Sequence, residues 1–329
     1  MINHSAFRVT VVVPSYNMAL TLPRAIQSAA RQSLPPLEIL VIDDGSTDST
    51  VEVLKNLQSK TPLLRFITQK NGGNAAAKNT GIRNAQGDWI GFLDADDEWL
   101  PDRLIKQAEL LEREPDCCWA AGAYQRIRIA HGKENACGKI RVGNDVRHSS
   151  KDFFDALSMI AGPTSLWIGT VLAKKNTLQE LGLFDETLSG CDDTDFWVRM
   201  ALNHPQVAFV KQPIAKYTVA QAGSLTSLAA SQVEPSRLTF FSKLKRYSEA
   251  AQGVETKSIC RKILQKEVGT YARALARSGN PGAAKQVIQW SQSNSMPGLP
   301  WKYTLAASLP APVIRAARSV WHYVRGKLR

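Results

Sequence analysis

Short runs of β-branched and other apolar residues alternate with longer segments of helical period over the first hundred residues of the chain. This alternation predicts helices packed on a largely parallel sheet. The predicted strands cover residues 9–13, 39–42, 63–67 and 89–93. The predicted helices cover residues 22–30, 46–57, 74–85 and 103–114.

Beyond residue 114 the sequence keeps a mixed α/β pattern and then becomes helical. It predicts an extended polar loop at 131–151, a strand within 166–173, a short helix ending at 181, a helix from 192 to 202 and a strand at 207–219. Strand signals disappear from residue 230 onward. We therefore expect one α/β domain at residues 1–225 and a basic helical region at residues 226–329.

The composition excludes several classes of protein. With 329 residues, 44% of them hydrophobic and 21% charged, the chain is neither disordered nor collagenous. Five cysteines without CxxC spacing predict reduced thiols in a cytosolic compartment and no metal cluster. The N-terminal residues do not resemble a secretory leader, and no run of about 18 apolar residues predicts a membrane-spanning helix.

Polar and acidic side chains follow three of the predicted strands directly. They lie at residues 14–17 (PSYN), 43–48 (DDGSTD) and 94–98 (DADDE). The carboxyl ends of parallel strands meet at one edge of a sheet, where ligands bind. A dinucleotide fold and a P-loop are excluded because GxGxxG does not follow the first strand and GxxxxGK[ST] is absent.

Asp94 and Asp96 are separated by one residue and would repel a diphosphate unless a divalent cation lay between them. They therefore suggest oxygen ligands for Mg²⁺ or Mn²⁺ bridging to a nucleotide diphosphate. Tyr16 offers a flat apolar face for a base, and Asp44 offers an acceptor for a ring N–H or a ribose hydroxyl. Each loop alone is also compatible with a solvated turn or helix cap, whereas the combination favours a site.

Four segments in order resemble the motifs of family-2 inverting nucleotide-sugar glycosyltransferases with the A-type fold. They are VVVPSYN (11–17), VIDDGSTDST (41–50), NGGNAAAKNTGI (71–82) and WIGFLDADDEWLPDRL (89–104). The resemblance covers residues 7–220 and implies an α/β fold of GT-A type, with a Rossmann-like mixed sheet flanked by helices. The C-terminal helical extension lies outside it. The implied donor is a nucleotide-diphosphate sugar, commonly a UDP-sugar, with inversion at the anomeric carbon.

The same resemblance implies roles for individual residues. Tyr16 stacks on the base, Asp44 binds its ring N–H, Asp94 contacts the ribose or the sugar, and Asp96 holds the metal together with Asp94. The full set of implied donor-binding residues is Pro14, Tyr16, Asn17, Asp43, Asp44, Lys78 and Asp94. Lys78 stands where the family often has Arg, so a positive group near the phosphates is kept but bidentate geometry is lost.

A second acidic cluster occurs at residues 192–195 (DDTD). Read as a helix start, it places carboxylates at the positive end of the helix dipole. Displacement at an anomeric carbon also needs a base that removes the proton of the acceptor hydroxyl. The resembled family has a Glu-Asp pair here whose second acid is the base. The resemblance therefore implies Asp193 as the base, with Asp192 secondary.

Residues 310–329 form a basic amphipathic segment with Trp321 and Tyr323. This pattern predicts an interfacial helix on an anionic membrane, although a docked terminal helix with solvated arginines is equally compatible. No nucleic-acid-binding module accompanies the charge, so we expect no nucleic-acid partner. Membrane attachment would suit a lipid-linked saccharide acceptor. We therefore expect a cytoplasmic protein peripheral to the inner face of the cytoplasmic membrane.

The favoured hypothesis is a metal-dependent inverting glycosyltransferase of the bacterial surface-polysaccharide type. It would transfer a sugar from a nucleotide-diphosphate sugar to a hydroxyl of a saccharide or lipid-linked acceptor. One alternative is a non-catalytic nucleotide-sugar or carbohydrate-binding protein of the same fold. A sugar nucleotidyltransferase is another, although such enzymes usually carry a GGxGxR loop where this chain has PSYN.

Overall fold

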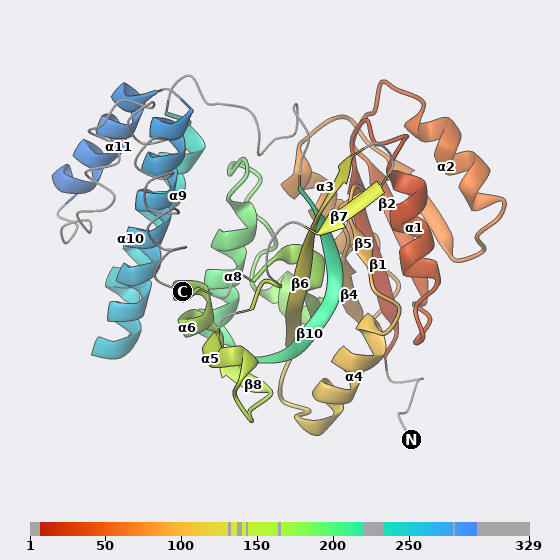
Figure 1. Cartoon of the computed structure of the whole chain (residues 1–329), viewed down its shortest axis with the longest axis horizontal. Helices are drawn as coiled ribbons and strands as arrows, with labels where there is room; N and C mark the ends of the chain where they lie inside the picture. Colours follow the sequence, from red (N-terminus) through yellow and green to blue (C-terminus); the bar gives the residue numbers. More distant parts are fainter. Residues whose placement is uncertain are drawn as a thin grey trace, which may run out of the picture. The chain divides into compact units, whose positions relative to one another are not determined.

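The computed structural model describes residues 7–130, 133–136, 140–142, 144–163, 166–219, 233–278 and 280–294. The chain divides into two compact units, Met1–Gln221 and Ala222–Arg329 (Figure 1). The first unit contains a mixed sheet and its helices, and the second contains helices in its described residues.

The first unit is built on one sheet. Its strands are β1 (Val9–Ser15), β2 (Glu38–Asp43), β3 (Leu64–Thr68), β4 (Trp89–Phe92), β5 (Glu98–Trp99), β6 (Trp119–Ala130), β7 (Lys133–Ala136), β8 (Phe153–Asp155), β9 (Leu172–Lys174) and β10 (Gln206–Thr218). The strand order is β3-β2-β1-β4-β9-β6-β10-β5, with β7 on β6 and β8 on β10. Strands β1 to β4 are parallel, and β9 runs antiparallel between β4 and β6. This arrangement confirms the predicted mixed α/β fold.

Helices cover both faces of this sheet (Figure 1). They are α1 (Leu22–Ala30), α2 (Thr50–Gln58), α3 (Asn74–Asn84), α4 (Arg103–Arg113), α5 (Asn144–Arg147), α6 (Ala156–Ala161), α7 (Lys175–Glu180) and α8 (Asp192–Asn203), with a 3₁₀ turn at Ile168–Thr170. Val11 and Val13 of β1 belong to the same buried cluster as Ile26 of α1. Val12 points the other way, toward Gly81 of α3. Successive residues of β1 are thus buried on opposite faces, as expected for an interior parallel strand.

Strand β1 continues through Pro14 and ends two residues later than the sequence predicts. Pro14 lies opposite Ile42 of β2, whereas the pairing of β1 with β4 stops at Val12. Proline has no N–H to donate, so it fits where the neighbouring strand on one side has already ended.

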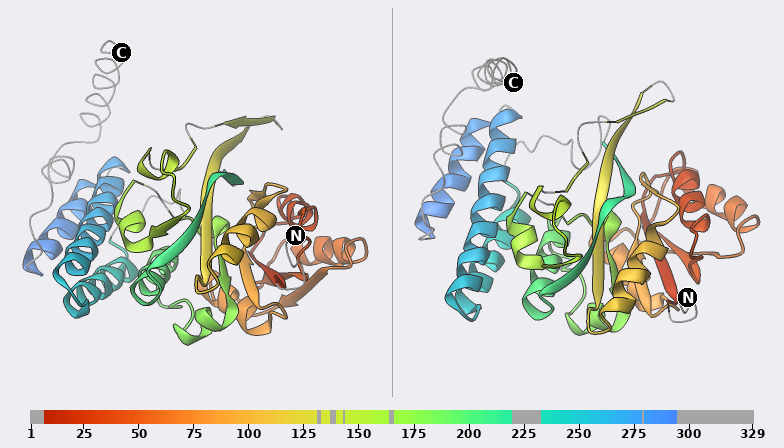
Figure 2. Two further views of the ribbon diagram at one scale, coloured as in Figure 1. Left: turned by 90° about the horizontal axis from the view of Figure 1, so that it is seen from below. Right: turned by 60° about the horizontal axis from the view of Figure 1, so that its bottom comes forward.

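Two long strands toward the β5 end of the sheet, β6 and β10, run side by side (Figure 2). The sequence pattern gave no strand at β6, because its first half is rich in Ala and Gly, which have low strand propensity. The polar loop predicted at 131–151 is wrong in part: Lys133–Ala136 pairs with β6 as β7, and Asn144–Arg147 forms α5. An edge strand such as β7 can be polar because one side lacks a partner.

The second unit consists, in its described residues, of α9 (Pro235–Ala250), α10 (Val254–Arg277) and α11 (Pro281–Ser293). Phe241 of α9 joins them, since its ring centroid lies 6.1 Å from that of Tyr271 and 5.6 Å from that of Trp290. Among the described residues, none of the helices is both long and apolar enough to span a bilayer. The amphipathic segment at 310–329 lies outside the described residues.

We expect Gly81→Ala to destabilise the first unit, because a Cβ at this position would lie 2.3 Å from Cγ1 of Val12. Overpacking of this kind costs about 1–3 kcal/mol. Urea unfolding followed by circular dichroism measures the loss. Gly282→Ala is the matched control: this helical glycine has only Oδ1 of Asn280 nearby, at 3.9 Å. The control should be neutral or slightly stabilising, and equal losses in both variants would contradict the packing argument.

Candidate functional site

The loops after β1 and β2 are joined by Asn17. Its Oδ1 accepts hydrogen bonds from the backbone N–H groups of Thr47 (2.8 Å) and Asp48 (3.3 Å). Its own N–H donates to Oγ of Ser46 at 2.9 Å. Asn17 has a φ of 55°, a left-handed conformation that Asn tolerates better than most residues. These contacts hold residues 46–48 in the loop, so the helix predicted from residue 46 begins at Thr50.

Tyr16 and Asp43 have very different surroundings. Tyr16 is 45% exposed, so its ring is accessible at this edge of the sheet. Asp43 is completely buried, and its Oδ1 accepts from the N–H of Ser46 at 3.2 Å. Its Oδ2 has no hydrogen-bond partner among the described residues. Asp43 therefore shapes the loop beneath the site, and Tyr16 stays a predicted base contact.

Asp44 is buried and binds the turn that precedes α3. Its Oδ1 accepts from Nε2 of Gln69 (2.7 Å) and the N–H of Gly72 (2.9 Å), and its Oδ2 accepts from the N–H of Gly73 (2.8 Å). Gly73 has a φ of 88°, which favours glycine. Asp44 thus fixes the start of α3. Its predicted contact with a nucleotide would use the acceptor capacity that remains on Oδ2.

Lys78 of α3 is completely buried beside the second acidic cluster. Its Nζ lies 2.6 Å from Oδ2 of Asp192, donates to Oδ1 of Asp193, and lies 4.5 Å from the ring centroid of Phe184. The sequence pattern placed Lys78 near the donor phosphates and gave no sign of this ion pair. The side chain of Asp192 is 6% exposed and that of Asp193 is 33% exposed, so Asp193 is the more accessible carboxylate.

The charges of this cluster shift the pKa values of Lys78 and Asp193. Burial alone would lower the pKa of Lys78, but Asp193 and Asp192 outweigh it and raise that pKa above its ordinary value. Burial raises the pKa of Asp193 to about 6, against the opposing effect of Lys78 and with a further contribution from Asp192. Lys78 and Asp193 are therefore both ionised at neutral pH, and Asp193 is more basic than a solvated aspartate.

The acidic loop after β4 lies close to this cluster. Burial raises the pKa of Asp94 to about 7, and the charges of Asp96 and Asp193 add to the rise, whereas Lys78 opposes it. Burial also raises the pKa of Asp96. The carboxylates from the strand end and those from the start of α8 thus form one electrostatically coupled group, which is the juxtaposition that the sequence predicted.

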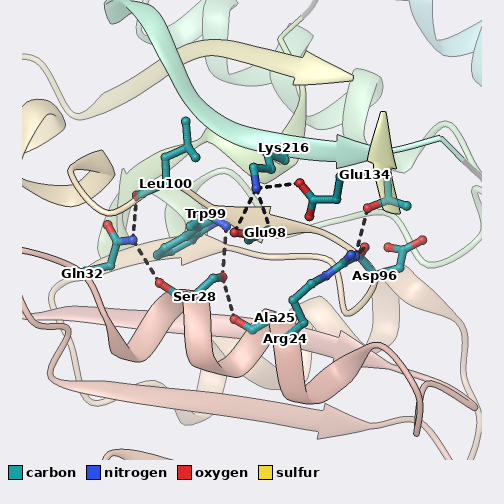
Figure 3. A network of polar contacts seen from close by, with 11 residues as sticks. Arg24, Ala25, Ser28, Gln32, Asp96, Glu98, Trp99, Leu100, Glu134 and Lys216 are labelled. Carbon is teal, nitrogen blue, oxygen red and sulfur yellow. Dashed lines mark hydrogen bonds and ion pairs between the residues drawn. The ribbon is translucent and has the colours of Figure 1, made fainter. Parts of the chain in front are cut away.

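Two residues not singled out by the sequence, Arg24 and Asp97, hold this loop in place, and Figure 3 shows Arg24 beside Asp96. Arg24 of α1 donates to the backbone O of Asp96 (2.5 Å) and to Oγ1 of Thr218 (3.1 Å). Oδ1 of Asp97 accepts from the N–H of Thr218 at 2.6 Å. The DADDE cluster could have drawn attention to Asp97, whereas Arg24 lies in an ordinary amphipathic helix. Both fix the backbone of the loop and leave the carboxylates of Asp94 and Asp96 unpaired by these contacts.

Within the part of the chain that the structure describes, no three His, Cys, Asp or Glu side chains form a ready-made metal site. The residues present nevertheless fit a hard divalent cation. Asp94 and Asp96 offer oxygen ligands only, and the crowding of Asp94 with Asp193 is a negative charge that a cation would relieve. Two carboxylates suffice for Mg²⁺ or Mn²⁺ when a diphosphate and water supply the other ligands.

The sequence of the chain is also similar to that of known proteins. Residues 10–154 match the family model described as Glycosyl transferase family 2. An uncharacterized glycosyltransferase of Haemophilus influenzae is 40% identical over 175 residues, which are 53% of this chain and 64% of that protein. A chondroitin synthase of Escherichia coli is 42% identical over 96 residues, 29% of this chain and 14% of that protein. The chain spans less than two thirds of the length of either relative.

Solved structures show the same fold. S. aureus TarS 1–349 in complex with UDP-GlcNAc aligns with a TM-score of 0.62 at 17% identity, covering 91% of this chain and 83% of that one. The mannosyltransferase PcManGT from Pyrobaculum calidifontis, in complex with GDP-Man and Mn²⁺, aligns with a TM-score of 0.60 at 19% identity. It covers 96% of this chain and 80% of that one. At 17% and 19% identity, the likeness to these two structures shows a shared fold alone.

We expect Asp44→Asn to lower the free energy of unfolding by about 1–3 kcal/mol. The substitution replaces one carboxylate oxygen by an amide nitrogen, which cannot accept a hydrogen bond, so the bond from the N–H of either Gly72 or Gly73 is lost. Urea denaturation measures the change. Asp88→Asn is the control, since this carboxylate is 63% exposed and its 3.7 Å ion pair with Arg8 contributes little. Unchanged stability in Asp44→Asn would show that the turn before α3 holds without these bonds.

Proposed function

We propose that the chain is an inverting glycosyltransferase, on the premise that its residues 10–154 match the family model of Glycosyl transferase family 2. It transfers a sugar from a nucleotide-diphosphate sugar to a hydroxyl group of a saccharide acceptor. The observation that carries the proposal is the meeting of two acidic segments. Asp94 after β4 is electrostatically coupled to Asp193 at the start of α8, although 98 residues lie between them in the chain.

Asp193 is the proposed base. A base must reach the acceptor hydroxyl, and the side chain of Asp193 is 33% exposed while that of Asp192 is 6% exposed. Its pKa of about 6 keeps it ionised at neutral pH and makes it a better proton acceptor than a solvated aspartate. As pH falls below about 6, Asp193 takes up a proton, so transfer should fail on the acidic side.

The proposed donor lies along the carboxyl ends of β1, β2 and β4. The accessible ring of Tyr16 would stack on the base, and the next residue, Asn17, ties the loop that carries Tyr16 to the loop after β2. UDP-GlcNAc bound to TarS and GDP-Man bound to PcManGT support a nucleotide-sugar donor for a protein of this fold. A UDP-sugar is our first choice, in keeping with the resemblance of the sequence motifs.

A divalent cation, Mg²⁺ or Mn²⁺, is part of the proposal. Asp96 and Asp94 would hold it, because they offer oxygen ligands and burial raises the pKa of both carboxyls, so a bound cation would favour their charged forms. When bound, such a cation neutralises the negative charge that develops on the leaving diphosphate. Arg24 and Asp97 keep the loop backbone in place for both carboxylates. The complex of PcManGT with GDP-Man and Mn²⁺ supports this choice of metal class.

The acceptor and the location are proposed on the sequence. The chondroitin synthase relative supports an acceptor of saccharide type. The basic segment at 310–329 fits an anionic membrane surface, so we propose a lipid-linked saccharide acceptor at the inner face of the cytoplasmic membrane.

We expect Asp193→Asn to reduce sugar transfer by about 10²–10⁴-fold, because the amide cannot take the acceptor proton. UDP release from a panel of nucleotide sugars, with water or a saccharide as acceptor, measures the loss. UDP affinity in isothermal titration should stay near the wild-type value. Asp102→Asn is the control and should leave turnover unchanged, because the carboxylate of Asp102 lies on the surface and is 56% exposed. Near-normal turnover of Asp193→Asn would remove this residue from the mechanism.

We expect Asp96→Asn to weaken UDP binding in the presence of Mn²⁺ to the level measured in EDTA, because one of the two proposed metal ligands is lost. Isothermal titration of UDP with and without Mn²⁺ gives this comparison directly. Mn²⁺-independent UDP binding by the wild type would contradict the metal site. A non-catalytic binder would bind UDP without any turnover, and a sugar nucleotidyltransferase would release pyrophosphate instead of UDP.

A further inference from the structure

Lys78 occupies a position that does not suit a simple donor contact. Its side chain is 1% exposed, and its ammonium already has two carboxylate partners, Asp192 and Asp193. The ring of Phe184 closes a further side at 4.5 Å from Nζ. A group that reached the phosphates would first have to leave these partners. The contacts of Lys78 therefore point toward α8 and its carboxylates.

The helix that carries Lys78 is held against the segment before α8. Asn79, the next residue, donates from Nδ2 to the backbone O of Phe184 (2.9 Å) and to Oε1 of Glu186 (2.8 Å). Its Oδ1 accepts from the N–H of Phe184 at 2.9 Å. On the other side, Gly81 packs without a Cβ against Val12 of β1. These contacts fix the distance between α3 and α8, and with it the position of the ammonium.

The two carboxylates that bind Lys78 differ in how deeply they are buried. Asp192 is buried, with its Oδ2 at 2.6 Å from Nζ, so it serves as an internal counter-ion. Asp193 receives the second hydrogen bond through Oδ1 and keeps a third of its side-chain surface exposed. One buried cation thus orients a partly exposed carboxylate, while a neighbouring buried carboxylate balances part of the charge of the cation.

We propose that Lys78 is a positioning residue, which orients the Asp193 carboxylate and, together with Asp192, sets how readily Asp193 accepts a proton from the acceptor hydroxyl. This inference rests on the proposed function, in which Asp193 is the base. It differs from the role that the motif resemblance gives to Lys78, namely a positive group near the donor phosphates.

The charges that face Asp193 come from three segments. Lys78 lies on α3, Asp192 lies on α8, and Asp94 of the loop after β4 carries a charge that Asp193 influences. Lys78 lowers the pKa of Asp193 and Asp192 raises it, while burial raises it most. Removal of the lysine charge and removal of the Asp192 charge should therefore move the titration of Asp193 in opposite directions.

The test is the pH profile of kcat for UDP release, with UDP-GlcNAc as the probe donor. In Lys78→Met the acidic limb should move to higher pH by roughly one unit or more, because an opposite charge at hydrogen-bond distance has been lost. In Asp192→Asn it should move to lower pH. Lys78→Arg keeps the charge and should restore a profile close to wild type. Lys175→Met is the control, because Nζ of Lys175 donates to the backbone O of Ala85 at the end of α3 and touches no carboxylate in the described residues.

A merely structural lysine would lower the amount of folded protein without shifting the profile. An unshifted acidic limb in folded Lys78→Met and Asp192→Asn would overturn the proposal. If the acidic limb of Lys78→Met is unshifted and its KM for the donor is raised, Lys78 contacts the donor phosphates instead. If Lys78→Met does not fold, the opposite shift in Asp192→Asn and the rescue by Lys78→Arg decide. A ¹³C NMR titration of the Asp193 carboxyl gives the same shifts without turnover, so an inactive wild type would count against the proposed function alone.

Discussion

The candidate site depends on a buried ion group in which one ammonium binds two carboxylates. Lys78 contributes a single positive charge, and Asp192 and Asp193 contribute two negative ones. Burying charges is costly unless they are paired and hydrogen-bonded, so the group stabilises the contact of α3 with α8 only while all three members are present. One net negative charge remains, and it lies beside the carboxylates of the loop after β4. The chain as a whole carries a net charge of +12, yet this edge of its sheet is acidic.

Two buried or partly buried arginines near the site donate to backbone carbonyls and so hold the backbone in place. Arg24 donates to the carbonyl of Asp96 and to Thr218. Arg103 is completely buried and donates to the carbonyls of Gly169 and Val171, with its guanidinium 3.6 Å from the ring centroid of Trp99. Burial lowers the pKa of Arg103, and carbonyl acceptors replace the carboxylate that a buried arginine usually has. Because both arginines donate to carbonyl and hydroxyl oxygens, these hydrogen bonds do not occupy the carboxylates of Asp94 and Asp96.

The sequence predicted the strands that position the loops. Residues 9–13 and 39–42 are mainly β-branched and residues 89–93 are an apolar run with two aromatic side chains, and these segments form the core of β1, β2 and β4. Strand β6 escaped prediction because small residues give no local strand signal, and only its pairing with β9 and β10 decides its conformation. Local periodicity depends on residues that are neighbours in the chain. The strands of this sheet, in contrast, pair with strands that lie far from them in the sequence.

The same limit applies to the site. Motif positions indicated which residues gather at the sheet edge, and Asp94, Asp96 and Asp193 do gather there. The motifs did not indicate what each side chain contacts. Asp44 binds the turn at 72–73, and Lys78 binds carboxylates 114 and 115 positions later in the chain. Such partners depend on how α3 packs, which a one-dimensional pattern does not contain.

The coupling of Lys78 to Asp193 connects the fold to the chemistry of a base. A carboxylate with a pKa of about 6 is ionised by roughly ten to one at neutral pH, so it is ready to accept a proton and still basic enough to assist transfer. Burial without the lysine would keep the carboxylate protonated, and a lysine without burial would leave an ordinary, weakly basic aspartate. The balance requires the ammonium to stay at hydrogen-bond distance. The close packing of Gly81 on β1, the bonds from Asp44 to the turn before α3 and the bonds from Asn79 to Phe184 therefore act together, because each holds α3 at the distance from α8 that this balance needs.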